Sequence, residues 1–225
     1  MLLSMKVKPD TDIEDILFFK EADFTEFERV IPIFGPNGIG KSTLIRAIKD
    51  HVVDVKIGGA KQTAVYSYQN GTDNFKIRRA RSYAENFDPV FMLSKLNAQS
   101  VSEGQSIIYS MFDLLDALYP GKPLDEKEKD TLVLLDEIDS GLSIDNIDIT
   151  MRKIKYIVRK RDNVQFIFSF NSPRVLKHFP EVLSMYDGKK IELHTDEDML
   201  AEIRKHKKEF DKARKYSNGR PKVFG

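Results

Sequence analysis

The feature that most constrains this chain is the stretch Gly35 to Thr43, which reads GPNGIGKST. It follows an apolar run at residues 30–34 and precedes residues 44–48, whose pattern is typical of a helix. A glycine-rich loop between a strand and a helix lets several backbone N–H groups point at one anion, and the helix dipole adds positive charge there. The spacing therefore predicts a phosphate-binding loop. The alternative is a glycine turn followed by a capped helix.

Two side chains of this loop have expected chemical roles. Lys41 is expected to reach the β- and γ-phosphates of a nucleotide, and the Ser42 hydroxyl to ligate Mg²⁺. The rest of the loop is expected to bind the phosphates and consists of Gly35, Pro36, Asn37, Gly38, Ile39, Gly40 and Thr43. The loop thus predicts a site for ATP and Mg²⁺.

The order of apolar patterns predicts an α/β fold. Strands alternate with helices through most of the 225 residues, which favours a mostly parallel sheet with helices packed around it. Buried strands are expected at 30–34, 132–135 and 164–170, helices at about 107–118, 145–161 and 197–215, and hairpins at 52–68 and 182–193. Pro32 is expected to lack a ladder partner or to mark a bulge, because proline has no N–H to donate.

We expect one domain, residues 1–225, with a small lobe at about 70–118 and a basic C-terminal helix and tail at 197–225. The chain has no cysteine, which excludes disulfides, thiol catalysis and cysteine-ligated metals. The start lacks the apolar core of a signal peptide, and no apolar run approaches the ~18 residues of a membrane span. A cytoplasmic protein with no integral membrane span is therefore expected.

A pair of carboxylates follows the apolar run at 132–135. Asp136 and Glu137 lie at the carboxyl end of this expected strand, where open α/β sheets bind their ligands. Asp136 is expected to hold Mg²⁺, directly or through water, opposite Ser42. Glu137 is expected to act as the base that orients the attacking water. The alternative is a charged strand end with no catalytic role.

Together these motifs resemble those of an ABC-type ATPase, of the soluble branch that includes the SMC, RecF and OLD-like proteins. GPNGIGKST resembles the Walker A motif of the family, and LVLLDE resembles its Walker B motif. Ser102 to Ser106 resembles the signature motif, with Glu103 in place of its first glycine, and Asp139 to Leu142 resembles the D-loop. Asn171 follows the next strand, where many members have a histidine, and Gln69 is the candidate for the Q-loop glutamine.

The resemblance implies a P-loop NTPase fold, an ABC-ATPase head with a reduced helical lobe, that forms a head-to-tail dimer with a second copy of itself. ATP would lie between the Walker A motif of one copy and the signature of the other, which would contribute Ser102, Gly104 and Gln105. The implied catalytic residues are Glu137, Lys41 and Asn171, and the implied metal site comprises Ser42, Asp136 and Gln69. Asn171 can donate a hydrogen bond to a γ-phosphate but cannot take up a proton near neutral pH, so slow hydrolysis is expected.

Three functions stay open on the sequence. The first is an ATPase that serves DNA maintenance, repair or defence, with basic runs at 76–81, 152–161 and the C-terminus that contact phosphate backbones. The second is an ATP-gated module with little hydrolysis that regulates a partner effector, a toxin or nuclease; Asn171 favours it and Glu137 opposes it. The third is the ATP-binding subunit of a transporter, which the short segment between Gln69 and Ser102 disfavours.

Overall fold

The computed structural model describes the backbone of residues 2–7, 23–25, 28–50, 53–57, 63–69, 111–121 and 130–218, and the side chains of residues 28–48, 111–121 and 131–212. Three of the sequence-based predictions lie outside these ranges: the signature motif at 102–106, the basic cluster at 76–81 and most of the lobe at 70–118. Among the described residues, no helix has the length and apolar character needed to cross a membrane.

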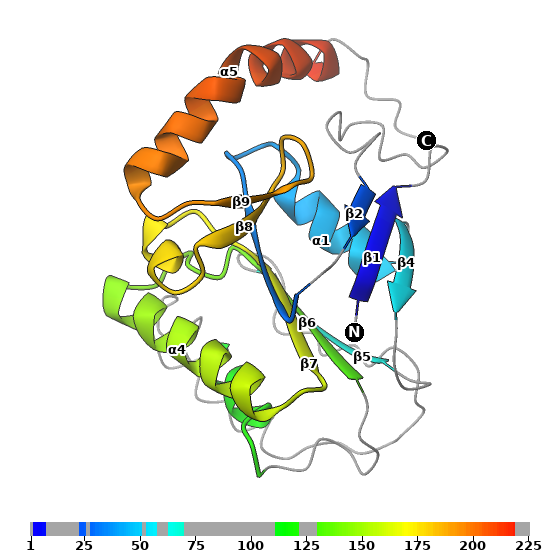
Figure 1. Ribbon diagram of the computed structural model, residues 1–225, viewed down its shortest axis with the longest axis vertical. Helices are drawn as coiled ribbons and strands as arrows, with labels where there is room; N and C mark the ends of the chain where they lie inside the picture. The colour runs from blue at the N-terminus through cyan, green and yellow to red at the C-terminus, as the bar shows by residue number, and fades with distance from the viewer. Residues whose placement is uncertain are drawn as a thin grey trace, which may run out of the picture.

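A six-stranded sheet forms the centre of the structure, in the order β5-β6-β7-β3-β8-β9 (Figure 1). Its strands are β5 (Thr63–Gln69), β6 (Asp130–Asp136), β7 (Val164–Ser169), β3 (Val30–Phe34), β8 (Glu181–Ser184) and β9 (Lys190–Glu192). The first five are parallel to one another, and β9 pairs antiparallel with β8 as a hairpin. The mostly parallel sheet and the hairpin near residue 187 are therefore confirmed.

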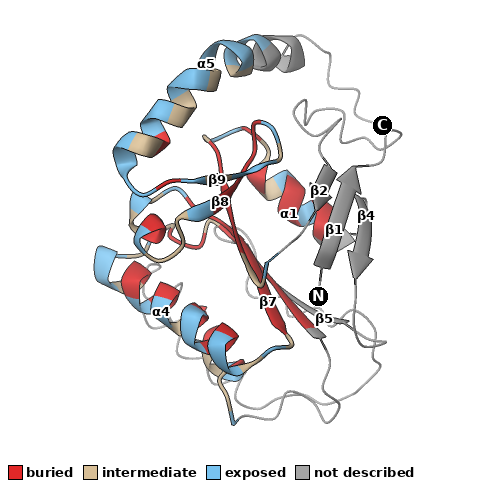
Figure 2. Ribbon diagram, viewed as in Figure 1, coloured by how far each residue is buried: buried red, intermediate tan, exposed pale blue. Residues whose placement is uncertain are grey.

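Two helices lie on opposite sides of this sheet, α1 (Lys41–Asp50) and α4 (Ile144–Lys160) (Figure 1). Both bury one face and expose the other (Figure 2). The buried face of α4 includes Met151, Ile154 and Ile157, which recur at helical spacing. Ser143 caps the start of α4 by accepting a hydrogen bond from the N–H of Asn146 (3.4 Å). The helix predicted at 145–161 is thus confirmed within one residue at each end.

Residues 111–117 are helical, in agreement with the amphipathic helix predicted at 107–118. Their apolar face is buried at Met111, Leu114 and Leu115. On the opposite face, Asp116 Oδ1 accepts a hydrogen bond from Lys153 Nζ of α4 (2.5 Å). This segment therefore packs against the core and is linked to α4 by an ion pair.

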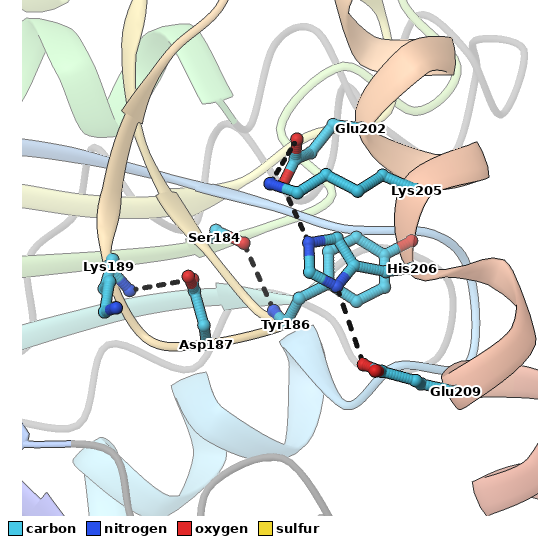
Figure 3. Close-up of polar contacts among 8 residues, drawn as sticks. All are labelled: Ser184, Tyr186, Asp187, Lys189, Glu202, Lys205, His206 and Glu209. Atoms are coloured by element: carbon cyan, nitrogen blue, oxygen red, sulfur yellow. Dashed lines mark hydrogen bonds and ion pairs between the residues drawn. The ribbon is translucent and has the colours of Figure 1, made fainter.

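The long C-terminal helix α5 (Asp196–Asn218) packs against the β8–β9 hairpin. The ring of His206 stacks on the ring of Tyr186, with centroids 4.4 Å apart (Figure 3). His206 Nε2 lies 3.0 Å from Glu202 Oε1 on the preceding turn of α5. The residue before Tyr186, Met185, donates its N–H to the carbonyl of Phe34 (2.9 Å), at the start of the glycine-rich loop. The hairpin turn therefore lies between α5 and that loop.

A second, three-stranded antiparallel sheet has the order β2-β1-β4. Its strands are β2 (Asp23–Thr25), β1 (Leu2–Val7) and β4 (Val53–Ile57). The predicted hairpin at 52–68 is wrong, because β4 pairs with β1 while β5 pairs with β6 along its whole length. Both strands do lie in the segment that the sequence predicted to be extended. The choice of partner depends on edges offered by distant segments, which a local pattern does not contain.

Pro32 lies in the centre of the sheet, between β7 and β8. The carbonyl of Arg29 accepts a hydrogen bond from β7 (2.8 Å), and the carbonyl of Phe34 accepts one from Met185, directly after β8 (2.9 Å). Because successive residues of a strand point their polar groups to opposite sides, the nitrogen of Pro32 faces β8. Strand β3 pairs with β8 only from Ile33 onward. Proline therefore occupies a position just before that ladder begins, as expected for a residue without an N–H.

Candidate functional site

The candidate site lies at the carboxyl ends of neighbouring parallel strands. The glycine-rich loop leaves the end of β3, Asp136 is the last residue of β6, and Asn171 follows the end of β7. Since β6, β7 and β3 are adjacent and parallel, their carboxyl ends lie at one edge of the sheet. Open α/β sheets bind ligands at this edge.

The glycine-rich loop is tightly packed at its first residue. A Cβ atom on Gly35 would lie 2.8 Å from Cγ2 of Ile39 and 3.0 Å from Cβ of Met185. Gly38 and Gly40 have positive φ values of 83° and 105°, which residues with a side chain rarely adopt. These glycines bring the backbone into a compact turn, closed by a hydrogen bond from the N–H of Ile39 to Pro36 O (3.3 Å).

Helix α1 begins directly after this turn. Its first hydrogen bond runs from the N–H of Leu44 to Gly40 O (2.9 Å), so the N–H groups of Lys41, Ser42 and Thr43 have no partner within the helix. No acidic residue lies in the first turn of α1 to compete for these donors. The helix start therefore presents N–H groups that the helix itself does not use, together with the positive end of its dipole, which suits a phosphate.

Lys41 is the buried cation of the site, with only 5% of its surface exposed. Its Nζ donates to Gly35 O (2.6 Å) and to Oδ1 of Asn171 (2.9 Å). Burial lowers the pKa of Lys41 below its usual value, because an ammonium is costly to desolvate. Three carboxylates oppose this shift, in the order Glu137, Asp139 and Asp136. The ammonium is thus close enough to all three carboxylates to interact with them electrostatically.

Ser169, the last residue of β7, joins the two carboxylate residues predicted from the sequence. Its hydroxyl donates to Oδ1 of Asp136 (2.6 Å) and accepts from the N–H of Glu137 (2.7 Å). Its carbonyl accepts from the N–H of Ile138 (3.0 Å). Glu137 has a positive φ of 49°, a strained conformation for a residue with a side chain that is often found at functional sites. Ser169 therefore stabilises the turn in which Glu137 lies.

Sequence analysis assigned no role to Ser169. The available signal was its position within the strand VQFIFS, because it is a hydroxyl among residues that are all buried. A fully buried hydroxyl needs a hydrogen-bond partner. Nothing in the sequence indicates that the partner is Asp136.

Asp139 makes a second link between the ends of β6 and β7. Its Oδ2 accepts hydrogen bonds from the N–H groups of Asn171 (2.8 Å) and Ser172. Sequence analysis placed Asp139 in a D-loop but did not connect it to Asn171. The carboxylate is buried, and its Oδ1 has no hydrogen-bond partner among the described residues.

The remaining predicted residues are placed only in part. Gln69 is the last residue of β5 and is paired in register with Asp136, so the two lie side by side on adjacent strands. Ser42 is half-buried in the first turn of α1. Ser102, Gly104 and Gln105 lie outside the described residues.

The donor set at this edge fits a magnesium nucleotide. Among the described side chains, no group of three or more histidine, aspartate or glutamate residues could hold a metal ion by itself. Mg²⁺ bound with a nucleotide needs fewer protein ligands, because phosphate oxygens and water complete its coordination. Ser169 engages one oxygen of Asp136, and within the described part of the chain no hydrogen bond is donated to the other.

No protein-family model and no curated protein matches the chain. Among solved structures, it is similar to a protein assigned as a metal-chelate type ABC transporter, in an inward-facing conformation. The TM-score is 0.55 at 19% identity, over 90% of this chain and 88% of that one. It is also similar to Stu0660 of Streptococcus thermophilus, with a TM-score of 0.47 at 14% identity, over 91% of this chain and 80% of that one. The first comparison shows that the fold resembles an ABC-type fold.

Proposed function

We propose that this protein binds Mg-ATP at the glycine-rich loop and hydrolyses it. The observation that carries the proposal is the position of Lys41, which bonds both Gly35 and Asn171 and interacts with the carboxylates of Asp136 and Glu137. Residues from three distant parts of the sequence thus meet around one ammonium at the ligand-binding edge of an ABC-like fold. A purely structural lysine would not require a helix start without acidic residues and a strained glutamate within its electrostatic reach.

Each residue then has a chemical role. Lys41 and the first N–H groups of α1 bind the β- and γ-phosphates, and Ser42 and Asp136 hold Mg²⁺, which supplies positive charge to the phosphate oxygens. The Glu137 carboxylate accepts a proton from water as the water oxygen attacks the γ-phosphorus. The bond between that phosphorus and the β–γ bridging oxygen breaks, which leaves ADP and inorganic phosphate.

The proposal includes a head-to-tail dimer that closes over ATP. Asn37, Gly38 and Thr43 are exposed, so the outer side of the loop is open to a second copy. The partner subunit's Ser102, the partner subunit's Gly104 and the partner subunit's Gln105 would complete the γ-phosphate site. This assignment rests on the resemblance of residues 102–106 to the ABC signature motif.

The first test is nucleotide binding by Lys41→Ala. ATP with Mg²⁺ at 100 times its Kd should stabilise the wild type by ~2.7 kcal/mol, which is about 5–10 °C in Tm for a chain of this size. Lys41→Ala should show no shift, because the phosphates lose their buried cation. Arg152→Ala is the matched control, since it removes an exposed cation of α4. A full ATP shift in Lys41→Ala would disprove the phosphate-loop assignment.

The second test concerns the dimer. Glu137→Gln keeps the shape of the side chain but removes the base, so ATP should trap a dimer that light scattering detects. Adding Ser102→Glu should abolish this dimer while each monomer still binds ATP, because the new carboxylate would repel the γ-phosphate of the other copy. A Glu137→Gln protein that stays monomeric at saturating ATP would rule out the head-to-tail dimer.

We further propose a role linked to DNA, as in the SMC, RecF and OLD-like branch. The outer face of α4 is exposed and basic, and within the described residues Arg152, Arg159 and Lys160 have no acidic partner. A duplex bound there should stimulate ATP turnover, and its affinity should fall steeply with salt. Arg152→Glu combined with Arg159→Glu should remove both effects. A DNA affinity that does not change with salt concentration would argue against nucleic acid as the partner.

A second candidate is an ATP-gated module that regulates a protein effector with little hydrolysis. The hydrogen bond between Lys41 and Asn171 favours it, because an amide at this position cannot exchange a proton during turnover. ATP-dependent dimerisation without multiple turnovers would distinguish this module from an ATPase. The ABC transporter similarity raises a third role, as a transporter subunit, which predicts co-purification with a membrane protein.

A further inference from the structure

Asp139 fixes the backbone at the end of β7 without being part of that strand. One carboxylate oxygen, Oδ2, accepts hydrogen bonds from two consecutive N–H groups, those of Asn171 (2.8 Å) and Ser172. Two bonds to one charged acceptor restrain both peptide planes, and bonds to a carboxylate are stronger than those between neutral groups. The position of the Asn171 Cα–Cβ bond is therefore set by Asp139.

The side chain of Asn171 has a defined orientation for a separate reason. Lys41 Nζ lies 2.9 Å from the amide and can only donate hydrogen bonds, so the amide oxygen must face it. The amide nitrogen, with both of its hydrogens, must then face away from Lys41. Asn171 is exposed, and its Nδ2 makes no hydrogen bond with the described residues. The amide thus holds the buried ammonium on one side and presents two donors on the other.

We propose that Asp139 is a positioning residue that lets the site distinguish a nucleoside triphosphate from a diphosphate. It holds Asn171 so that Oδ1 anchors Lys41 while Nδ2 donates to the terminal phosphate of the triphosphate. This inference rests on the proposed function. A diphosphate lacks the group that Nδ2 contacts, so losing Asp139 lowers the preference of the site for ATP over ADP.

Two observations separate this role from simple packing. Lys41 also donates a hydrogen bond to Gly35 O (2.6 Å), which involves neither Asn171 nor Asp139, so we expect the phosphate loop to keep its cation in a variant. The second oxygen of Asp139 is buried without a hydrogen-bond partner among the described residues, so local packing does not fully satisfy this carboxylate. An unsatisfied buried group calls for a reason beyond stability.

The experiment measures the Kd of ATP and of ADP, each with Mg²⁺, by calorimetry in a background that carries both Glu137→Gln and Ser102→Glu, where ATP is not consumed and the ATP-dependent dimer does not form. Asp139→Ala should lower the preference for ATP over ADP by about tenfold or more, the loss expected for one hydrogen bond to a charged group. The ratio of the two Kd values is the readout, because Asp139 also interacts electrostatically with Lys41 and the loss of its charge affects both nucleotides.

Asp148→Ala is the matched control. Asp148 is as buried as Asp139, each 8% exposed, and it also binds residues that follow β7, namely Arg174 and His178 of the 3-10 helix η2 (Pro173–Lys177) and its cap. Its loss should lower Tm without changing the ratio of the two affinities. A ratio that falls equally in both variants would show a general structural effect and would overturn the inference.

A second variant keeps the test decisive if Asp139→Ala does not fold. Asn171→Asp preserves the backbone clamp and the oxygen that faces Lys41, but it replaces the two amide donors with a negatively charged oxygen. It should weaken ATP far more than ADP. An unchanged ratio in either variant, with a parent that prefers ATP, overturns the inference and leaves the proposed function intact. A parent that binds no nucleotide refutes the proposed function itself, and one that binds ATP and ADP equally overturns the inference alone.

Discussion

Adding one methyl group to the first glycine of the loop should destabilise the protein measurably. The Cβ of Gly35→Ala would lie 2.8 Å from Cγ2 of Ile39 and 3.0 Å from Cβ of Met185, whereas carbon atoms in contact are normally ~3.5–4.0 Å apart. Neither neighbour has room to retreat, since they are 4% and 1% exposed respectively. Met185 is also held to β3 by its hydrogen bond to Phe34 O (2.9 Å).

The size of the effect follows from these contacts. Overpacking of a dense core costs about 1–3 kcal/mol, and we expect ~2 kcal/mol for Gly35→Ala because two contacts are violated at once. For a chain of this length, that corresponds to a fall of about 4–8 °C in Tm. Nucleotide affinity should fall as well, because the displaced Gly35 carbonyl is the acceptor that holds Lys41 (2.6 Å).

Denaturant titration followed by circular dichroism gives the free energy of unfolding, and calorimetry gives the affinity for ATP. Gly121→Ala is the control: Gly121 has a φ of 90°, but nothing lies within 4 Å of its Cβ position. It should therefore show only the backbone cost of ~1–2 kcal/mol and no change in ATP affinity. A loss of less than about 0.5 kcal/mol in Gly35→Ala, which is within the scatter of such measurements, would show that the close contacts at Gly35 cause no strain. An ATP affinity equal to that of the wild type would show that they do not position Lys41.

Two further predictions concern buried hydroxyl groups. Ser169→Ala removes the hydroxyl that is hydrogen-bonded to Asp136 and to the N–H of Glu137. It should therefore cost about 1–3 kcal/mol in denaturant titration and raise the Mg²⁺ concentration needed for ATP-dependent stabilisation. Burial, with a smaller contribution from Glu202, raises the pKa of Tyr186 to about 12. The folded state keeps this proton to a higher pH than the unfolded state does. The free energy of unfolding should therefore be unaffected below about pH 10 and fall by up to ~2–3 kcal/mol towards pH 12. Tyr186→Phe should remove this part of the alkaline loss, as measured by unfolding curves at a series of pH values.

The sequence predicts the elements of this fold better than their pairing. Continuous apolar runs identified β6 and β7, because strands buried on both faces carry no polar alternation. Helical spacing identified α4, whose N-cap Ser143 and basic last turn mark its ends. The hairpin proposed for 52–68 fails because β5 finds a seven-residue partner in β6, more than 60 residues away in the sequence.

In the candidate site, too, the local motifs are predictable from the sequence and the long-range contacts are not. Spacing alone identifies the glycine-rich loop and the carboxylate pair, since both motifs are local. The contacts inside the site are not local: Lys41 and Asn171 are 130 residues apart, and Ser169 and Asp136 are 33 apart. The parallel order β6-β7-β3 brings them together. That order follows from packing of the whole chain, so Ser169 could be recognised as unusual but not assigned to a partner.

The charges around Lys41 lead to one more expectation. One buried ammonium lies among three carboxylates, Asp136, Glu137 and Asp139, so the side chains nearest to Lys41 carry a net negative charge before any phosphate arrives. A triphosphate adds several negative charges in a partly desolvated place, where repulsion is weakly screened. Lys41 and the dipole of α1 cannot offset both sets of charges, so binding should require a divalent cation between Asp136 and the phosphates. Chelation by EDTA should therefore abolish the ATP-dependent rise in Tm, and added Mg²⁺ should restore it. An equal rise with EDTA would mean that Asp136 lies away from the bound phosphates, and it would remove this residue from the proposed metal site.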